Sequence, residues 1–389
     1  MTGMRTRPRH ALGNDASLLH AAASAFADEG FDAASMASVS GRAHLTYGAA
    51  YARFEDKSAF AVHVFEEDLF PGLQQAIEHA EASLAEGASQ FAAALEAFTR
   101  PGPGLLASLE LIQASQFDPA LREGIRQPVA AWLADWIDPT GSPTPSRALV
   151  RATLAYLTLG LVLMDGRPWQ PDLAGEFARY RAALVAPGSA TELPVDRAAH
   201  LDAWPFDTGD PRMDRALEAM AQAVGEVGYH RATIGRICRS AGVSAGYLYA
   251  RYENKRAFFL AANDRLLEYG LSENAAFAER LASAYGPGIA EAVVWREFQR
   301  PDLATKRTLA LEANRLARYD QQMRQVHDER ELALAAQVPQ GPGRQAALAY
   351  LYSDMAMAFG VNLVPNLLPE IWTLPFDMVT VPLLAGLSV

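Results

Sequence analysis

Cysteine is almost absent from this chain of 389 residues, in which Cys238 is the only one. A single cysteine excludes an intrachain disulfide and provides no cysteine cluster for zinc. Long hydrophobic runs are also missing, because the longest uncharged apolar stretch, Ala152 to Met164, is shorter than the roughly 20 residues that span a bilayer. The basic N-terminus lacks the apolar segment of a secretory signal. We therefore expect a cytoplasmic protein with no membrane contact.

Two further absences concern fold and chemistry. The alternation of apolar and polar residues that is typical of strands is nearly lacking, whereas apolar residues recur every three or four positions in Ala- and Leu-rich stretches. The expected fold class is all-α. The sequence contains no nucleophile elbow, phosphate-binding loop or paired-carboxylate signature. We therefore expect no enzyme, no metal and no resident cofactor.

The sequence does contain a long internal repeat. Residues 31–60 align with residues 229–258 at a constant offset of 198 without a gap, so that Tyr51 and Lys57 match Tyr249 and Lys255. Similar segments return later at offsets of 200 and 202, and residues 154–157 resemble 348–351 at an offset of 194. Solenoid repeats are only about 20 to 50 residues long. The longer period predicts a duplicated module.

The repeated segment predicts two short helices joined by a tight turn. In the second copy, Thr233 is a suitable N-cap, Gly242 can take a positive φ, and Ser244 can cap the next helix. This is the layout of a helix-turn-helix, whose second helix enters the DNA major groove. Asn254 can cap the helix that follows, which places Lys255 where a DNA phosphate could bind.

Residues 233–244, followed by Gly246, Tyr247, Tyr249 and Lys255, resemble the DNA-binding signature of the TetR family of transcriptional regulators. The resemblance implies a small N-terminal DNA-binding domain and a larger helical domain that binds an inducer and forms a two-fold dimer through a four-helix bundle. Because each half of the chain has the length of one family member, it implies a single-chain pseudo-dimer. The expected domains are residues 12–72 and 211–270 for DNA binding, 73–186 and 271–389 for regulation, and 187–210 for the linker.

The two expected DNA-binding domains differ in charge and motif. Side chains sum to −2 over residues 28–60 and to +4 over residues 226–258. In the first copy His44 replaces the turn glycine, although histidine tolerates the left-handed conformation better than most residues. The basic residues 5–9 fit either a minor-groove arm or a disordered tail. The candidate DNA-binding residues are Ser35, Thr46, Tyr47, Gly48, Tyr51, Lys57, Thr233, Ser244, Ala245, Gly246, Tyr247, Tyr249 and Lys255.

These features predict a ligand-responsive regulator, a repressor by preference, that binds double-stranded DNA as a monomer and reads a pseudo-palindromic or asymmetric operator. Further association of chains stays open. The alternative is a helical ligand- or protein-binding module whose DNA-reading domains are degenerate. Pocket residues are implied by the family only, and plain core packing is the alternative for each of them. They are Trp132, Trp136, Tyr156, Trp169, Trp295, Tyr350 and Met355.

Three isolated groups carry weaker signals. Cys238 falls on an inward-facing position of a short helix, which favours an inert buried thiol over a redox sensor. His327 and Glu331 lie one helical turn apart, and a solvated helix face is favoured there over a metal site. Asp165 and Arg167 fit either polar groups of a pocket or the end of a helix.

Overall fold

The computed structural model describes residues 9–45, 54–137, 145–195, 199–201, 205–367, 371 and 374–385, and every regular element within them is a helix. The first half contains α1 (Arg9–Ala33), α2 (Met36–Arg42), α4 (Lys57–Val64), the π-helix η1 (Phe65–Leu69), α5 (Phe70–Glu86), α6 (Ala88–Thr99), α7 (Pro103–Ala114), α8 (Pro119–Ile137), α9 (Pro145–Leu163) and α10 (Ala174–Val185). The all-α prediction is confirmed.

The second half repeats this order of helices, with one long helix in the place of α4, η1 and α5. It contains α11 (Pro211–Arg231), α12 (Ile234–Ala241), α13 (Ala245–Tyr249), α14 (Lys255–Tyr285), α15 (Pro287–Phe298), η3 (Pro301–Leu303), α16 (Ala304–Ala317), α17 (Gln321–Gln337), α18 (Arg344–Leu363), η4 (Val364–Asn366) and α19 (Asp377–Leu384). We call α1 to α4 and α11 to α13 with the start of α14 the first and second heads. The remaining helices of each half form its body.

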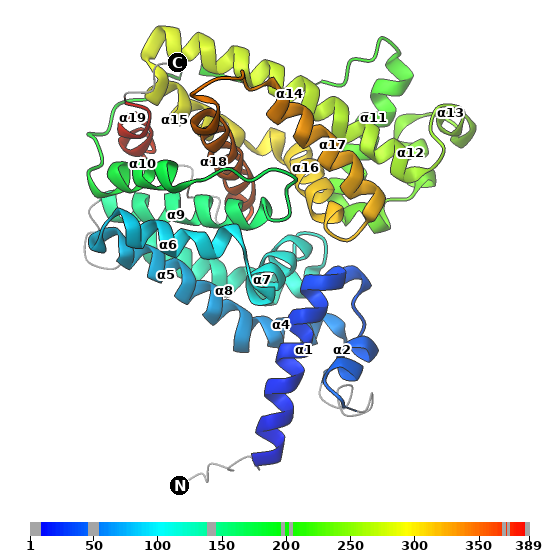
Figure 1. Cartoon of the computed structure of the whole chain (residues 1–389). Coiled ribbons are helices and arrows are strands. Elements are labelled where there is room, and N and C mark those ends of the chain that lie inside the picture. The colour runs from blue at the N-terminus through cyan, green and yellow to red at the C-terminus, as the bar shows by residue number, and fades with distance from the viewer. Residues whose placement is uncertain are drawn as a thin grey trace.

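The two bodies pack against each other through α9 and α18, which cross in the middle of the molecule (Figure 1). Both crossing points are glycines. A Cβ atom on Gly160 would overlap the carbonyl group of Ala356, and one on Gly360 would overlap the carbonyl group of Tyr156. Reciprocal contacts of this kind are the mark of a two-fold interface.

The reciprocal contacts also fix which residues correspond. Gly160 matches Gly360, and Tyr156 matches Ala356, both at an offset of 200. The expected correspondence of residues 154–157 with 348–351 at an offset of 194 is therefore wrong. Similar residues recur in these two segments. However, the close approach of the backbones of α9 and α18 requires a glycine at one position in each helix, and these glycines decide which residues of the two helices correspond.

The C-terminal helix α19 is short, as the prolines near the end of the sequence predict. It has eight residues with Pro382 inside, and it packs on α10 and α15. A proline inside a helix removes one backbone hydrogen bond and costs about 3 kcal/mol. The bundle of α9, α10, α18 and α19 is consequently less regular on the side of the second half.

One described helical segment, residues 344–366, is long and apolar enough to cross a membrane by length and composition alone. Half of its most apolar window is buried, and α18 within it packs along α9. The core helix of a soluble protein passes the same test, so this is weak evidence for a membrane span.

Candidate nucleic-acid interface

The second head has the helix caps that its sequence predicts. The hydroxyl of Thr233 accepts a hydrogen bond from the backbone N–H of Arg236 at 3.2 Å and begins α12. Gly242 ends α12 with φ of 65°, a left-handed conformation that favours glycine. The hydroxyl of Ser244 then accepts from the N–H of Tyr247 at 3.1 Å and begins α13. The turn and both caps fix the direction of the short α13.

The outer surface of α13 carries the groups that can meet DNA. Ser244, Ala245 and Gly246 are exposed, and Tyr249 is 51% exposed. Tyr247 is placed differently, because its hydroxyl donates to the carboxylate of Asp210 at 2.7 Å, beside the start of α11. In this structure Tyr247 ties α13 to α11.

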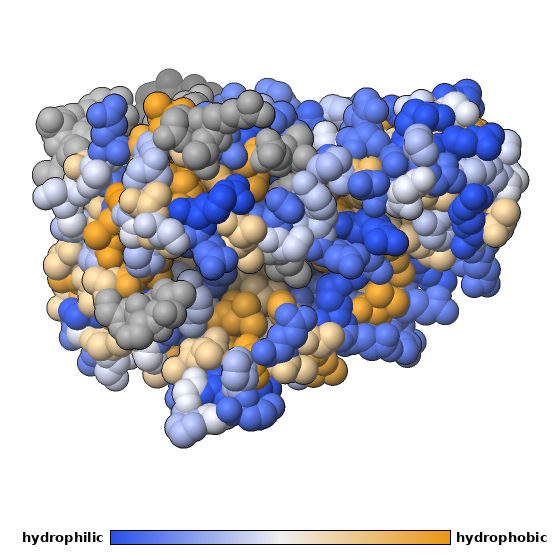
Figure 2. Space-filling model, turned by 90° about the horizontal axis from the view of Figure 1, so that it is seen from above, coloured by the Kyte–Doolittle hydropathy of each residue, from blue (hydrophilic) through white to orange (hydrophobic). Residues whose placement is uncertain are grey.

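Arginines surround this surface. Arg239 on α12 is exposed and pairs with no acidic side chain among the described residues. Arg236 pairs with Glu226, and the guanidinium of Arg251 lies over the Tyr247 ring at 4.1 Å. Figure 2 shows hydrophilic residues covering the end of the molecule where the second head lies. The surface therefore suits a phosphate backbone.

Lys255 lies against the backbone of its own head. Its ammonium group donates to the carbonyl oxygens of Tyr229 at 2.9 Å and Ala232 at 3.2 Å. In the first head, Lys57 donates in the same way to the carbonyl oxygen of Phe31 at 2.7 Å. Burial lowers the pKa of both lysines. Each ammonium thus holds the fourth helix of its head to the end of the first, and the phosphate-binding role expected of Lys57 and Lys255 stays a prediction.

The first head is described only in part. Ser35 and Ser38 form a reciprocal capping box at the start of α2, and His44 has a φ of 55°, so histidine does take the left-handed conformation expected of it. Residues 46–53 lie outside the described residues. The candidates Thr46, Tyr47, Gly48 and Tyr51 fall among them.

The described surface of the first head is electrically compensated. Arg42 on α2 pairs with Asp28 at 2.6 Å and with Glu29 at 2.5 Å, both on α1. The corresponding residue of the second head is Ser240, and that head carries the unpaired Arg239 beside it. The charge difference seen in the sequence is therefore present on the folded surface.

Comparison with known families matches both heads. The model of the tetR family of bacterial regulatory proteins matches residues 18–64 and 216–262, which end in α4 and in α14. The chain is a TetR-family regulator in tandem duplication. Its two family domains make it a DNA-binding transcriptional regulator. No curated protein matches the chain.

In this TetR-family chain each head is attached to its own body by the same hydrogen bond. The N–H of Phe31 donates to Glu110 on α7 at 2.7 Å, and the N–H of Tyr229 donates to Glu312 on α16 at 3.0 Å. Each N–H directly follows a glycine with a positive φ near the end of the head's first helix. The two attachments are thus duplicated in detail.

Each head also rests on the opposite half. A Cβ atom on Gly30 would lie 2.9 Å from the ring of Tyr319, and one on Gly228 would lie 3.1 Å from the ring of Phe117. Tyr319 and Phe117 correspond at an offset of 202. These crossed contacts make the position of each head depend on both bodies.

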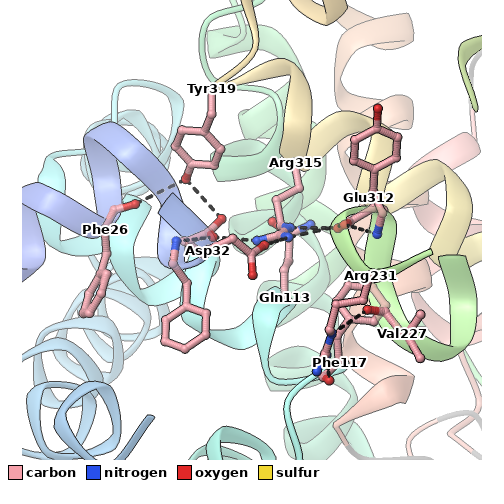
Figure 3. A network of polar contacts seen from close by, with 12 residues as sticks. Phe26, Asp32, Gln113, Phe117, Val227, Arg231, Glu312, Arg315 and Tyr319 are labelled. Atoms are coloured by element: carbon pink, nitrogen blue, oxygen red, sulfur yellow. Dashed lines mark hydrogen bonds and ion pairs between the residues drawn. The ribbon is translucent and has the colours of Figure 1, made fainter. Parts of the chain in front are cut away.

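Arg315 on α16 joins the two attachments in one buried network (Figure 3). Its guanidinium is 3% exposed and pairs with Glu110 at 2.6 Å, Glu312 at 2.8 Å and Asp32 at 2.6 Å. The corresponding residue of the first half is Gln113, whose side-chain amide donates to the carbonyl oxygen of Leu311 at 3.5 Å. The corresponding positions 113 and 315 therefore hold one arginine, where a symmetric homodimer would have two or none. A cavity of about 180 Å³ lies beside it, between the heads.

The pocket candidates fall into two groups. Trp132, Tyr156 and Trp295 are buried in ring contacts, which fits the core-packing alternative. Trp169, Tyr350 and Met355 are only partly buried. The side chain of Trp136 lies outside the described residues.

Sequence reasoning missed the groups around Glu331. Glu331 is buried, and Arg167 from the first half pairs with it and also contacts His327. Burial, followed by repulsion from Arg167, lowers the pKa of His327 to about 3. The expected solvated helix face is therefore wrong at these residues, although the described residues hold no metal-binding group of three or more ligands. Cys238 is buried, and burial raises the pKa of its thiol.

Proposed function

We propose that this regulator is a ligand-responsive repressor that binds one asymmetric operator with both heads of a single chain. The observation that carries the proposal is the pair of attachments, from Phe31 to Glu110 and from Tyr229 to Glu312, joined through Arg315. Buried hydrogen bonds and ion pairs that connect both heads in this way can hold them at a fixed spacing. Two-fold DNA readers of this class place their recognition helices about 34 to 36 Å apart on the duplex.

Because both halves belong to one chain, DNA binding does not depend on the association of two chains. The α9–α18 interface lies within one molecule, so dimerisation is replaced by an intramolecular contact. One chain can then bind DNA at concentrations where a dissociating dimer could not. We place this function in the cytoplasm, together with the DNA.

The two heads contribute unequally in this proposal. The second head carries the exposed Tyr249 and the unpaired Arg239, whereas Arg42 of the first head is already paired with acids. The second head therefore supplies most of the affinity, and the operator is read asymmetrically.

A ligand can act through the helix that leaves each head. In the second half, Arg256 near the start of α14 pairs with Asp320, the N-cap of α17, at 2.9 Å. In the first half, Ser58 on α4 donates to Asp118 before α8 at 3.2 Å. A ligand that moves α17 thus moves the start of α14, provided that it binds the two states unequally.

Selection of bound fragments from genomic DNA, followed by titration at increasing salt, tests the proposal. We expect one chain per operator by light scattering, and an affinity that falls steeply with salt because several phosphates are neutralised. DNA binding seen only with two chains per operator would refute the single-chain mode.

The compensated charge of Arg42 favours a second possibility for the first head, namely that it grips DNA weakly or not at all. Retention of no specific DNA by the whole chain would support the alternative of a helical ligand- or protein-binding module. Footprinting separates the cases, because protection over one groove indicates one active head and protection over two indicates both.

A further inference from the structure

The cavity of about 180 Å³ between the heads is enclosed by parts of both halves. The first head contributes residues 31–32 and 57–58, and the second head contributes residues 227–228 and 230–231. The bodies contribute residues of α7 and α16, together with residues 117–118 between α7 and α8. One water molecule needs only about 10 to 15 Å³ of such a space. The cavity is therefore large enough for a small organic molecule that contacts both heads.

The duplication shows which side chains are missing from this space. In the second half, the guanidinium of Arg256 pairs with Asp320 at 2.9 Å. The first half has Ser58 and Asp118 at these positions, and the Ser58 hydroxyl donates to Asp118 at 3.2 Å. Both residues line the cavity, which thus lies beside the two positions that an arginine side chain connects in the second half. The first half has the smaller residue at three lining positions, where Ser58 matches Arg256, Ala114 matches Leu316, and Phe117 matches Tyr319.

Two acids that line the cavity each lack a hydrogen-bond donor that their counterparts have. Asp118 lacks the guanidinium and pairs with no cationic side chain among the described residues. Glu312 lacks a hydroxyl, because its counterpart Glu110 accepts from Tyr319 at 3.1 Å, whereas Phe117 has no hydroxyl to donate. A carboxylate has about four acceptor sites. Each of the two acids therefore has room for a further N–H donor.

The cations that line the cavity are already bound to oxygen atoms of the protein. Lys57 donates to two backbone carbonyl oxygens at 2.7 and 3.2 Å. Arg231 donates to two more, one of them across the gap between the halves (Figure 3). Arg315 pairs with three acids. The cavity therefore favours a ligand that donates hydrogen bonds to Asp118 and Glu312 over one that accepts them.

We infer that this cavity binds a small organic cation of the guanidinium class, which takes the place of the arginine that the first half lacks. An alkylguanidinium carries five N–H donors in a flat fork and forms charge-assisted hydrogen bonds with carboxylates. Asp118 binds its charge, and Glu312, whose side chain is 1% exposed, accepts a further N–H. The inference goes beyond the proposed function, because it places an effector between the heads instead of in a body.

A ligand in this cavity connects the heads as well as one head to its body. It contacts α4 of the first head, the start of α8, and the end of α11 in the second head. In the second half Arg256 connects α14 to α17 without a ligand, so we expect one ligand site per chain. Since the site exists only in the folded chain, the ligand should raise the melting temperature.

Three compounds of similar size test the charge preference by isothermal titration without DNA. They are ethylguanidinium, N-ethylurea and propionate, which are a cation, a neutral isostere and an anion. At constant ionic strength we expect one ethylguanidinium per chain, bound about tenfold more tightly than N-ethylurea, a difference of about 1.4 kcal/mol. Equal binding of these two compounds, tighter binding of propionate, or no saturable ethylguanidinium binding up to millimolar concentration would overturn the inference.

A variant at position 58 locates the site. Ser58→Arg installs the side chain of the second half, which should pair with Asp118, raise the melting temperature of the ligand-free chain and abolish ethylguanidinium binding. Ser272→Arg is the control, because it adds the same charge at an exposed position of α14 and should keep the binding. Full ethylguanidinium affinity in correctly folded Ser58→Arg would refute the site.

A second variant tests the charge without filling the cavity. Asp118→Asn can still accept the hydrogen bond that the N–H of Leu121 donates at 2.9 Å, so it is expected to fold. It should bind ethylguanidinium and N-ethylurea with similar affinity. A preserved preference for the cation would rule out Asp118 as the binding group.

Operator binding gives a separate readout. Ethylguanidinium and Ser58→Arg hold the first head in the same way, so both should change the affinity for the full operator in the same direction and leave the half-site of the second head unaffected. Opposite changes would contradict the shared position. Because the titrations contain no DNA, loss of ligand binding with intact operator binding refutes this inference alone. Loss of operator binding with intact ligand binding refutes the proposed function alone.

Discussion

Replacing Arg315 with methionine should reveal how much the buried ion pairs between the heads contribute to the stability of the chain. Arg315 is 3% exposed, and Glu110 and Glu312, which it pairs with, are each 1% exposed. Methionine fills similar space but leaves these two carboxylates buried without their counter-charge. Removing one partner of a buried ion pair typically destabilises a protein by about 3 to 5 kcal/mol. The third partner, Asp32, is 44% exposed and adds about 1 kcal/mol at most.

The expected loss for Arg315→Met is therefore about 3 to 5 kcal/mol in the free energy of unfolding. Urea unfolding followed by far-ultraviolet circular dichroism measures it. Gln113→Met is the matched control at the corresponding residue of the first half, where one weak hydrogen bond of 3.5 Å is lost. That change should cost no more than about 1.5 kcal/mol.

A second variant separates the charges from the packing. If buried charge causes the loss, adding Glu110→Gln and Glu312→Gln to Arg315→Met should recover much of it, because neutral groups of similar volume can replace a buried ionic cluster. A loss below about 1 kcal/mol for Arg315→Met, or no recovery in the triple variant, would refute the reasoning. The same variants should weaken binding to the full operator more than binding to the half-site of the second head, because only the full operator depends on head spacing.

Three further predictions concern the α9–α18 interface, the second head, and the acids Asp354 on α18 and Glu291 on α15, whose pKa values burial raises to about 6 and about 8. Gly160→Ala should destabilise the chain by about 1 to 3 kcal/mol in thermal unfolding, because the added carbon overlaps the facing helix, whereas Gly175→Ala, with open space around it, should be neutral or slightly stabilising. Arg239→Ala should reduce the slope of log affinity against log salt by about 1. Lys255→Met should lower the melting temperature, because it removes the hydrogen bonds to the carbonyl oxygens of Tyr229 and Ala232. The wild-type chain should become less stable as pH rises from 5 to 9, since raised carboxyl pKa values favour the folded state only while the acids stay protonated, and Asp354→Leu should flatten this profile.

Much of the fold could be predicted from the sequence because its signals are local. Helical periodicity, the caps at Thr233 and Ser244 and the glycine turn between them depend on neighbouring residues. The duplication is visible because the heads kept the same residues at the same spacing. Such patterns need no knowledge of distant contacts.

The roles of single side chains could not be predicted in this way. Lys255 occupies a sequence position that suits a phosphate, yet its ammonium group bonds to the carbonyl oxygens of Tyr229 and Ala232. The spacing of His327 and Glu331 favours a solvated helix face, yet Glu331 is buried and pairs with Arg167, which is far away in the sequence. Long side chains reach partners that only the packing of helices selects.

The sequence by itself determined that this chain is a duplicated all-helical protein with a basic second head, because helix formation, turns and charge are properties of short segments. Only the tertiary structure decided that Gly160 and Gly360 set the register of the halves and that Arg315 serves both heads. Those features arise where two helices from distant parts of the chain meet. Burial at such contacts makes the presence of a charge, or of a Cβ atom, matter strongly for the free energy of folding.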